Sequence, residues 1–401
     1  MSDSTVILNA RLLQYSAEND LAADSGLYQI AIEDALIRAI APMDTVRMAA
    51  SSDLDVGGDW ISAGAVDLQI NGALGLAFPD LRPDHFEQLQ AICELLWLQG
   101  VDGFCPTLVT TSLENFHGGL AAIHEFQRNF QRDQCCGSAK ILGVHLEGPF
   151  LNPAKRGAHP EGFLQPLTLE NVKTLIGDFA ETLSIVTLAP ELEAEDEVIE
   201  WLCDRHITVS LGHSLATAEQ ANRAFARGAT MVTHAFNAMP GLHHREPGLL
   251  GAALSNPDVF CGFIADGQHI CPPMLDLLIR SGRGSLHSLL GNLFLVSDAL
   301  SPLGLPAGLY PWDARQIEVV KGTARLADGT LSGTTLPLIE GAINLVKWGI
   351  CSLGEAIALA TQAPRQAIGL PGLAAGSPAQ LLRWHQDSRT DQITWQRLSF
   401  K

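Results

Sequence analysis

From residue 64 onward, short apolar segments rich in strand-forming residues alternate with amphipathic segments of helical periodicity. A strand that is apolar along almost its whole length is buried on both faces, and a helix between successive strands makes those strands parallel. Helical periodicity is clearest in residues 85–99, 197–206 and 215–228. Eight strands in this alternation predict an α/β fold, a closed (β/α)₈ barrel of the TIM type. The eight segments are residues 64–70, 103–109, 140–147, 183–190, 207–213, 231–236, 260–266 and 294–299.

The competing arrangement is an open, doubly wound parallel sheet. That fold usually carries a GxGxxG turn after its first strand, where the turn approaches a bound dinucleotide. No such motif follows residues 64–70, which favours the barrel.

The two ends of the chain differ from the barrel region in their pattern of apolar and polar residues. Residues 5–13 and 28–37 contain short alternating stretches of the kind seen in antiparallel strands. Residues 380–386 and 392–398, which follow a segment rich in Gly and Pro, again have a pattern typical of strands. We therefore expect both termini to form one small β-sandwich domain beside the barrel. The predicted bounds are 1–60 and 369–401 for this domain and 61–368 for the barrel.

The chain is acidic, because 25 Lys and Arg residues against 44 Asp and Glu residues give a formal charge of −19. That charge repels nucleic acid and anionic membrane surfaces, so neither is an expected partner. An anionic small substrate would need a local cationic pocket. The N-terminus lacks the basic start and apolar stretch of a signal peptide, and the eight cysteines form no CxxC pair. We expect a cytoplasmic protein with reduced thiols.

Residues able to bind a metal or to move a proton stand at the ends of five predicted barrel strands. The carboxyl ends of barrel strands meet on one rim, where TIM barrels place their chemistry. The motifs at these ends are HLEGP, LGHS, THAFNAM, IADGQH and VSDA, which carry Glu147, His213, His234, Asp266 with His269, and Asp298, respectively.

One carboxylate and two imidazoles, here Glu147, His213 and His234, are a typical ligand set for a catalytic divalent metal with one position left for water. Zinc is the favoured ion, with iron and manganese as alternatives, because ligand type alone does not select among them. The metal would lower the pKa of the water. Asp298 would take the proton of that water and later return it to a leaving group.

Each of these residues also has a purely structural interpretation. A histidine at a strand end is often a hydrogen-bonded structural residue, and Asp266 or Asp298 could be a helix N-cap. Gly148 and Pro149 could simply turn the chain out of its strand. The metal hypothesis therefore depends on a coincidence, because five separate strand ends all carry suitable chemistry.

Longer motifs are more specific than any single histidine. They resemble the amidohydrolase superfamily over nearly the whole chain, and within it the deacetylases of N-acetylglucosamine 6-phosphate. The resemblance implies metal-dependent hydrolysis of the acetamide of that sugar phosphate to glucosamine 6-phosphate and acetate. The motifs are VDLQINGALG (66–75), CPTLVTT (105–111), GVHLEGPFLNPAKRGAH (143–159), LGHS (211–214), VTHAFNAMPGLHHREPGLLGAAL (232–254), ADGQHI (265–270), VSDAL (296–300) and LSGTTLPL (331–338).

The resemblance also implies roles for individual residues. It supports the three metal ligands and makes Asp298 the catalytic acid and base. His159 would help to polarise the acetamide carbonyl. The implied substrate contacts are the backbone at Asn237 and Ala238, Arg245 on the phosphate (often from a neighbouring subunit), His269 on the sugar phosphate, and His159. Together with His243 or His244, Arg245 and His269 would form the cationic pocket that an anionic substrate requires.

Gln69 and Asn71 stand where many amidohydrolases carry a His-x-His pair and bind two metals. Neutral amides are poor metal ligands compared with imidazole. We therefore predict one divalent ion per subunit, with both amides hydrogen-bonded to the neighbouring site. A contribution of Arg245 to the phosphate site of another subunit would make the protein a homodimer.

Three other functions fit the same residues. The substrate could be the 6-phosphate of N-acetylgalactosamine, because the orientation of one hydroxyl is not readable from a sequence. The site could instead act on a cyclic amide or deaminate a base, as other amidohydrolases do. A catalytically silent metal or sugar-phosphate binding protein is the third, although Asp298 would have no use there.

Overall fold

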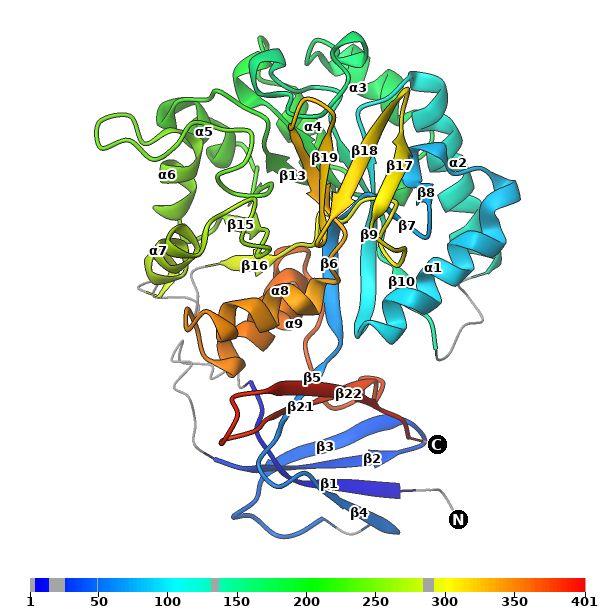
Figure 1. Ribbon diagram of the computed structural model, residues 1–401, viewed down its shortest axis with the longest axis vertical. Helices are drawn as coiled ribbons and strands as arrows, with labels where there is room; N and C mark the ends of the chain where they lie inside the picture. Colours follow the sequence, from blue (N-terminus) through cyan, green and yellow to red (C-terminus); the bar gives the residue numbers. More distant parts are fainter. Residues whose placement is uncertain (1–3, 14–25, 49, 131–136, 284–291, 401) are drawn as a thin grey trace.

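The computed structural model describes residues 4–13, 26–48, 50–130, 137–283 and 292–400. It shows a barrel surrounded by helices and, below it, a smaller group of β-strands in which the first and last described strands lie (Figure 1). This arrangement confirms the predicted fold class, although the exact bounds of the two domains remain a prediction.

Eight parallel strands form the wall of the barrel. The path runs from β9 through β11, β12, β13, β14 and β15 to β16, and β6 joins it through its parallel pairing with β9. A strand lies in each of the eight predicted segments. The bounds are β6 (Ala65–Ile70), β9 (Val101–Val109), β11 (Val144–Glu147), β12 (Leu183–Leu188), β13 (Thr208–Leu211), β14 (Met231–Val232), β15 (Phe260–Phe263) and β16 (Leu293–Leu295), with the short β10 (Lys140–Ile141) beside β9.

The barrel closes beyond the end of β16. The Asp298 backbone N–H donates to the Gln69 carbonyl at 2.9 Å, and the Asn71 N–H donates to the Ala299 carbonyl at 2.7 Å. This seam joins the last strand to the first, so it brings Asp298 beside Asn71 although 227 positions separate them.

Helices cover the outside of the barrel, and several begin at residues suited to capping. Thr217 and Gln220 form a capping box at the start of α5, and Ser352 and Glu355 do so at α9, which satisfies backbone N–H groups that a helix leaves free. The helices are α1 (Phe86–Leu98), α2 (Leu113–Asn129), α3 (Leu169–Ile176), α4 (Val198–Cys203), α5 (Ala218–Ala226), α6 (Gly248–Leu254), α7 (Pro272–Gly282), α8 (Leu338–Lys347) and α9 (Leu353–Ala367). Among the described residues, none of the helices is both long enough and apolar enough to cross a membrane.

A four-stranded antiparallel sheet, which is not among the strands predicted from the sequence, is inserted between β16 and α8. It consists of β17 (Gly308–Trp312), β18 (Arg315–Val320), β19 (Thr323–Leu326) and β20 (Leu331–Thr334). The hairpins turn at residues with positive φ, among them Asp313, Lys321 and Gly322. The sheet stands beside the carboxyl ends of the barrel strands (Figure 1), and Thr334 on β20 bonds to the seam through the Leu300 N–H.

The small domain combines strands from both ends of the chain. β5 (Trp60–Ala63) pairs antiparallel with β21 (Leu381–Gln386), which also pairs with β22 (Ile393–Leu398). The second sheet has the order β3-β2-β1-β4, and a shared apolar core includes residues of both sheets. The expected antiparallel pairing is present between β1 and β2 and between β2 and β3, whereas β4, which lies outside the predicted stretches, is parallel to β1. The bounds of this sheet are β1 (Ser4–Ala10), β2 (Tyr28–Glu33), β3 (Leu36–Pro42) and β4 (Ser52–Asp55).

Candidate active site

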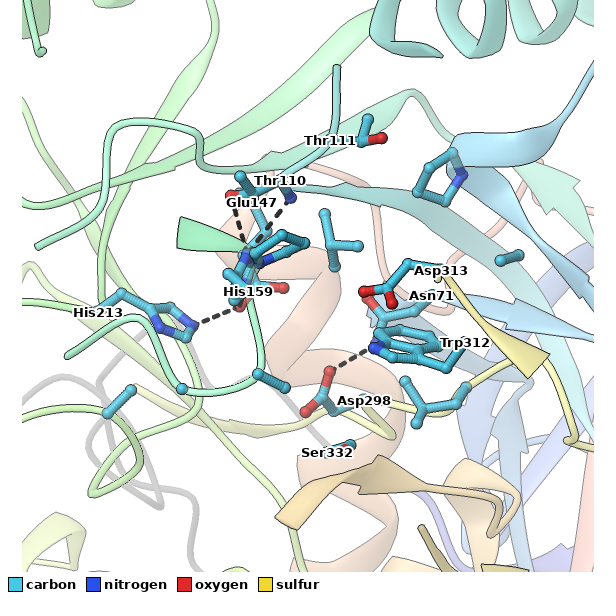
Figure 2. Close-up of a pocket in the computed structure, with 18 of the residues that line it drawn as sticks. Asn71, Thr110, Thr111, Glu147, His159, His213, Asp298, Trp312, Asp313 and Ser332 are labelled. Atoms are coloured by element: carbon cyan, nitrogen blue, oxygen red, sulfur yellow. Dashed lines mark hydrogen bonds and ion pairs between the residues drawn. The ribbon is translucent and has the colours of Figure 1, made fainter. Parts of the chain in front are cut away.

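A cavity of about 540 Å³ opens at the carboxyl ends of the barrel strands. Figure 2 shows Glu147, His159 and His213 on one side of it, and Asn71 and Trp312 on the other. Most residues selected from the sequence line this cavity, namely Asn71, Glu147, His159, His213, His234, Asn237, Ala238, His269 and Asp298. Gln69 is buried and reaches Glu147 and Asp298 through its amide.

The three proposed metal ligands meet at one point. The Glu147 Oε1 atom lies 2.9 Å from the His213 Nε2 atom and 3.0 Å from the His234 Nε2 atom. The two Nε2 atoms are 3.0 Å apart. All three residues are buried, and the ligand atoms that they offer lie within 4.8 Å of one another. A carboxylate and two imidazoles are therefore presented to a single small volume.

The hydrogen bonds around this cluster fit a bound cation. The His213 Nδ1–H donates to the Lys155 carbonyl at 2.8 Å, so the neutral ring carries its lone pair on Nε2, facing Glu147. Burial, followed by the nearby His159, lowers the pKa of His213 to about 4. Burial alone would raise the pKa of Glu147, but the three surrounding histidines, His159, His213 and His234, hold it well below its usual range. Electron pairs converging on one point repel each other unless a cation lies between them.

The backbone at the cluster has an uncommon conformation. φ is 49° at His213, 29° at His234 and 48° at Asp298. Positive φ is uncommon for non-glycine residues, and each such residue costs on the order of 1–3 kcal/mol and persists only where the surrounding structure holds it. Three of the proposed functional side chains are thus turned inward by strained backbone directly after their strands.

Two amides hold Asp298 in place. The Asn71 Nδ2–H donates to the Asp298 Oδ1 atom at 2.7 Å, and the Gln69 Nε2–H reaches the same atom at 3.3 Å and Glu147 Oε2 at 3.1 Å. Burial, together with the charge of Glu147, raises the pKa of Asp298 to about 6. A carboxyl group with a pKa near neutrality suits the exchange of protons with a reacting group.

The contacts of His159 define which of its nitrogens carries the proton. The backbone N–H of Thr110 donates to Nδ1 at 3.3 Å, so the neutral ring has its proton on Nε2. That nitrogen lies 3.8 Å from Glu147 Oε1. The Arg315 side chain holds the adjacent loop by donating to the Ala158 carbonyl at 2.7 Å. His159 therefore presents a hydrogen-bond donor beside the three proposed metal ligands.

Asp266 supports His269 and is not a helix N-cap. Its Oδ2 atom lies 2.8 Å from His269 Nδ1, and its Oδ1 atom accepts the Gln268 and His269 backbone N–H groups at 2.8 Å. The next helix, α7, begins at Pro272 with Cys271 as its N-cap. No described helix begins at Asp298 either, so the N-cap alternative is wrong for both aspartates.

The structure separates Arg245 from the cavity of its own chain. Arg245 and its neighbours His243 and His244 are exposed, and none of the three lines the cavity. The expected cationic pocket is therefore not assembled from these residues within one chain, where only His269 of the set reaches the cavity.

Other residues line the cavity without having been selected from the sequence. Among them are residues of the inserted sheet and of the end of β9, namely Thr110, Thr111, Trp312, Asp313, Leu331 and Ser332. The alternating pattern of residues 315–326 and the Lys321-Gly322 and Asp328-Gly329 pairs are hairpin signals that would have revealed the sheet. No comparable signal places the Trp312 side chain in the cavity.

Comparison with known proteins agrees with the fold and the cluster. The model of the Amidohydrolase family matches residues 61–395. The chain belongs to this family. The resemblance inferred from the sequence motifs is thereby confirmed, and members of the family depend on metal ions.

Several similar proteins are deacetylases. N-acetylglucosamine-6-phosphate deacetylase of Bos taurus is 36% identical over 332 residues, which are 81% of this chain and 78% of that protein. N-acetylgalactosamine-6-phosphate deacetylase of Escherichia coli O157:H7 is 32% identical over 347 residues, 86% of each chain. The N-acetyl-D-glucosamine-6-phosphate deacetylase of Mycobacterium smegmatis, solved in complex with N-acetyl-D-glucosamine-6-phosphate, has a TM-score of 0.79 and 25% identity, and the match covers 95% of this chain and 94% of that one.

Proposed function

We propose that this protein hydrolyses the acetamide of N-acetylglucosamine 6-phosphate to glucosamine 6-phosphate and acetate, as a step of amino-sugar metabolism. The observation that carries the proposal is the meeting of Glu147, His213 and His234 at one point, with Asp298 held beside them by Gln69. The similarity to deacetylases of acetylated hexosamine phosphates supports this substrate class.

The cofactor in this proposal is one divalent ion per subunit, with zinc as the favoured ion. Glu147, His213 and His234 would hold it, and when bound it would supply a Lewis acid that activates water and polarises the carbonyl. Gln69 and Asn71 turn their amide N–H groups toward carboxylates, and neutral amides are poor metal ligands compared with imidazole, so the proposal has a single ion.

Protein groups stabilise the developing charge, transfer the proton and bind the substrate. The His159 Nε2–H donates to the acetamide oxygen as negative charge develops there. Asp298 takes a proton from the water that attacks the carbonyl carbon, and it gives that proton to the nitrogen as the C–N bond breaks. The backbone at Asn237 and Ala238, together with His269, would bind the sugar phosphate. The products are the free amine and acetate.

The galactosamine epimer is the second candidate substrate, because a relative that is 32% identical carries that activity in its name. Purified metal-loaded protein should be assayed for acetate release from both 6-phosphorylated epimers, with unphosphorylated N-acetylglucosamine as a control. We expect turnover of the gluco epimer and much weaker turnover of the unphosphorylated sugar. Preference for the galacto epimer would favour the second candidate, and hydrolysis of neither sugar phosphate would refute both.

We propose a homodimer in which Arg245 reaches the phosphate of the neighbouring subunit. Support comes from the position of Arg245, which is exposed and outside its own cavity. Mixing R245A and D298N protomers tests this. Half of the dimers would be mixed and each would contain one complete site, so activity should recover to about a quarter of the wild-type level. No recovery above that of the separate variants, once subunit exchange is shown, would contradict a role in trans.

The proposed location is the cytoplasm. Cys93 and Cys261 are buried, free thiols, and burial raises the pKa of each to about 12, as expected for cysteines that remain reduced and unreactive. Cys271 is free but exposed, and Cys135 and Cys136 lie outside the described residues. Fractionation of the producing cells, followed by detection of the protein in each fraction, would test this location.

A further inference from the structure

Four buried polar side chains form a continuous line through the interior of the barrel, below the metal-binding cluster. His145 lies on β11, Thr187 on β12, Ser210 on β13, and Thr233 follows β14 directly. Their exposed fractions lie between 0% and 3%. The mechanism proposed above uses none of them, yet a polar group buried in an apolar interior is costly unless it is hydrogen-bonded.

Each member of the line bonds to the next. The His145 Nδ1 atom lies 2.9 Å from the Leu68 carbonyl of β6, and its Nε2 atom lies 2.7 Å from Thr187 Oγ1. Thr187 Oγ1 is 2.7 Å from Thr233 Oγ1, which is 2.6 Å from Ser210 Oγ. The line therefore connects five positions around the barrel.

The Leu68 carbonyl fixes the direction of every proton in this line. A carbonyl only accepts, so the neutral His145 ring carries its proton on Nδ1 and accepts at Nε2. Thr187 must then donate to His145, and Thr233 must donate to Thr187. Ser210, at the far end, donates to Thr233. Each hydroxyl has one possible orientation, which makes the line an ordered array.

The line lies directly beneath the proposed ligands. His145 precedes Glu147 by two residues on the same strand, so both side chains point to the same face of the sheet. Thr233 is the residue before His234, and Ser210 is three residues before the ligand that follows β13. β14 is only two residues long, Met231–Val232, and pairs with β13 at two positions. The side-chain hydrogen bonds of Thr233 therefore add substantially to the few backbone contacts that hold β14 in place.

We propose that the hydrogen-bonded line Leu68–His145–Thr187–Thr233–Ser210 positions the three ligand-bearing strands relative to one another along the barrel axis. Glu147, His213 and His234 meet at one point because of this alignment. Thr187 is the central member of the line. It lies on β12, which carries no proposed ligand, and it bonds to residues on both sides of that strand. The inference rests on the proposed metal site and extends it to residues that do not touch the metal.

The test is the substitution Thr187→Val, which keeps the shape of the side chain but leaves His145 Nε2 without a donor and Thr233 without an acceptor. Metal-free full-length protein should be titrated with Co²⁺, whose visible absorption reports coordination geometry, against a competing chelator. We expect T187V to bind Co²⁺ about 10-fold more weakly or more, with an altered absorption band, as found for outer partners of metal ligands. T187S, which retains the hydroxyl, should restore both.

Thr361→Val is the matched control. Thr361 is equally buried, and its hydroxyl bonds to the Ile357 carbonyl within α9, away from the ligands. T361V should leave Co²⁺ affinity and spectrum unchanged. S210A removes only the terminal donor, so it should weaken binding by about threefold, and it serves as the test if T187V does not fold.

The outcomes separate the two proposals. If Co²⁺ binding depends on His213 and His234 but folded T187V and S210A bind it as the wild type does, the positioning role of the line is refuted while the metal site stands. If wild-type Co²⁺ binding does not depend on these histidines, the metal site itself is wrong, and this inference fails with it.

Discussion

Glu147, His213, His234 and Asp298 stand on barrel strands or directly after them, whereas Trp312, Asp313 and Ser332 reach the same cavity from a sheet inserted after the last strand. The first group is buried and bonded within itself or to Gln69 and Asn71. In the second group, the Asp313 side chain is 34% exposed and pairs with Arg315 of its own hairpin. The comparison indicates that the strand ends hold the chemistry, and that the inserted sheet shapes the space for the substrate.

The two groups also differ in how far their backbone is constrained. The left-handed conformations of His213, His234 and Asp298 are held by backbone hydrogen bonds, because their carbonyls accept the N–H groups of Asn152, Asn237 and Thr334, respectively. Asp313 also has positive φ, but it lies in a two-residue hairpin turn, where that conformation is ordinary. Substitutions in the strand group should therefore affect the chemical step, and those in the inserted sheet should affect substrate binding.

The largest effect is expected for Asp298→Asn. The amide removes the acid and base but leaves the ligand cluster intact, so kcat should fall by on the order of 10³-fold, with metal content unchanged. Acetate release and elemental analysis on the same preparation measure both quantities. A variant that retains most of its turnover would remove Asp298 from the mechanism. Loss of the metal together with turnover would show that the residue is needed for metal binding instead.

His159→Ala should have the next largest effect. His159 belongs to a loop, yet Thr110 at the end of β9 fixes its ring, so it is expected to behave like the strand group. Removing a hydrogen-bond donor to a developing oxyanion lowers kcat by roughly 10²-fold, and KM should change little. H159Q, which restores an N–H donor, should recover part of the loss. An effect confined to KM would place His159 among the binding residues.

The barrel was predictable because its strands are buried on both faces. Burial on both faces requires segments that are apolar throughout, and such segments are visible in a sequence as eight separate runs. The residues at their carboxyl ends could then be placed on one rim without knowing any distance. Glu147, His213 and His234 were brought together by this topological argument, and the structure places their ligand atoms within 4.8 Å of one another.

The remainder of the cavity depends on information that a sequence pattern does not carry. The position of Trp312 follows from how an inserted sheet packs against the seam at Thr334, which is a tertiary contact. The line from His145 to Ser210 joins residues on or beside four separate strands, each of which looks like an isolated polar residue in an apolar run. Arg245 was selected because the family resemblance implied a phosphate contact, but its exposed position outside the cavity could be seen only in three dimensions.

A smaller effect is expected for Arg315→Ala, which tests the inserted sheet. Arg315 joins β18 to the loop that carries His159 through its bond to Ala158, so its loss should let the hairpin and the loop separate. We expect kcat/KM to fall by roughly 10-fold, mainly through KM. Arg325→Ala on β19 is the control, because the Arg325 side chain bonds within its own hairpin, at the Gly329 carbonyl, and this variant should behave as the wild type. A fall in kcat alone would contradict the division between the two groups.

The smallest effect on turnover is expected for Asp67→Asn, which tests the seam itself. Asp67 is buried, and its Oδ1 atom accepts the Ser297 and Gln69 N–H groups at 3.1 and 3.3 Å. Burial raises its pKa to about 7, compared with 3.8 for an ordinary aspartate. Asp67 does not line the cavity, so acetate release should remain close to that of the wild type.

The stability of this variant relative to the wild type should nevertheless depend on pH in a defined way. Because the folded Asp67 carboxyl binds its proton more tightly than the unfolded one, its contribution to stability is complete below pH about 4 and is lost as the pH rises through about 7. The asparagine side chain does not titrate, so D67N should gain at most about 4 kcal/mol relative to the wild type between pH 4 and pH 8. The unpaired N–H of the new amide lowers stability at both pH values and cancels in this difference. Urea unfolding at the two pH values measures this difference in the free energy of unfolding. Equal pH dependence in both proteins would mean that Asp67 is ionised in the folded protein. The seam would then tolerate a buried charge, as the strand group does.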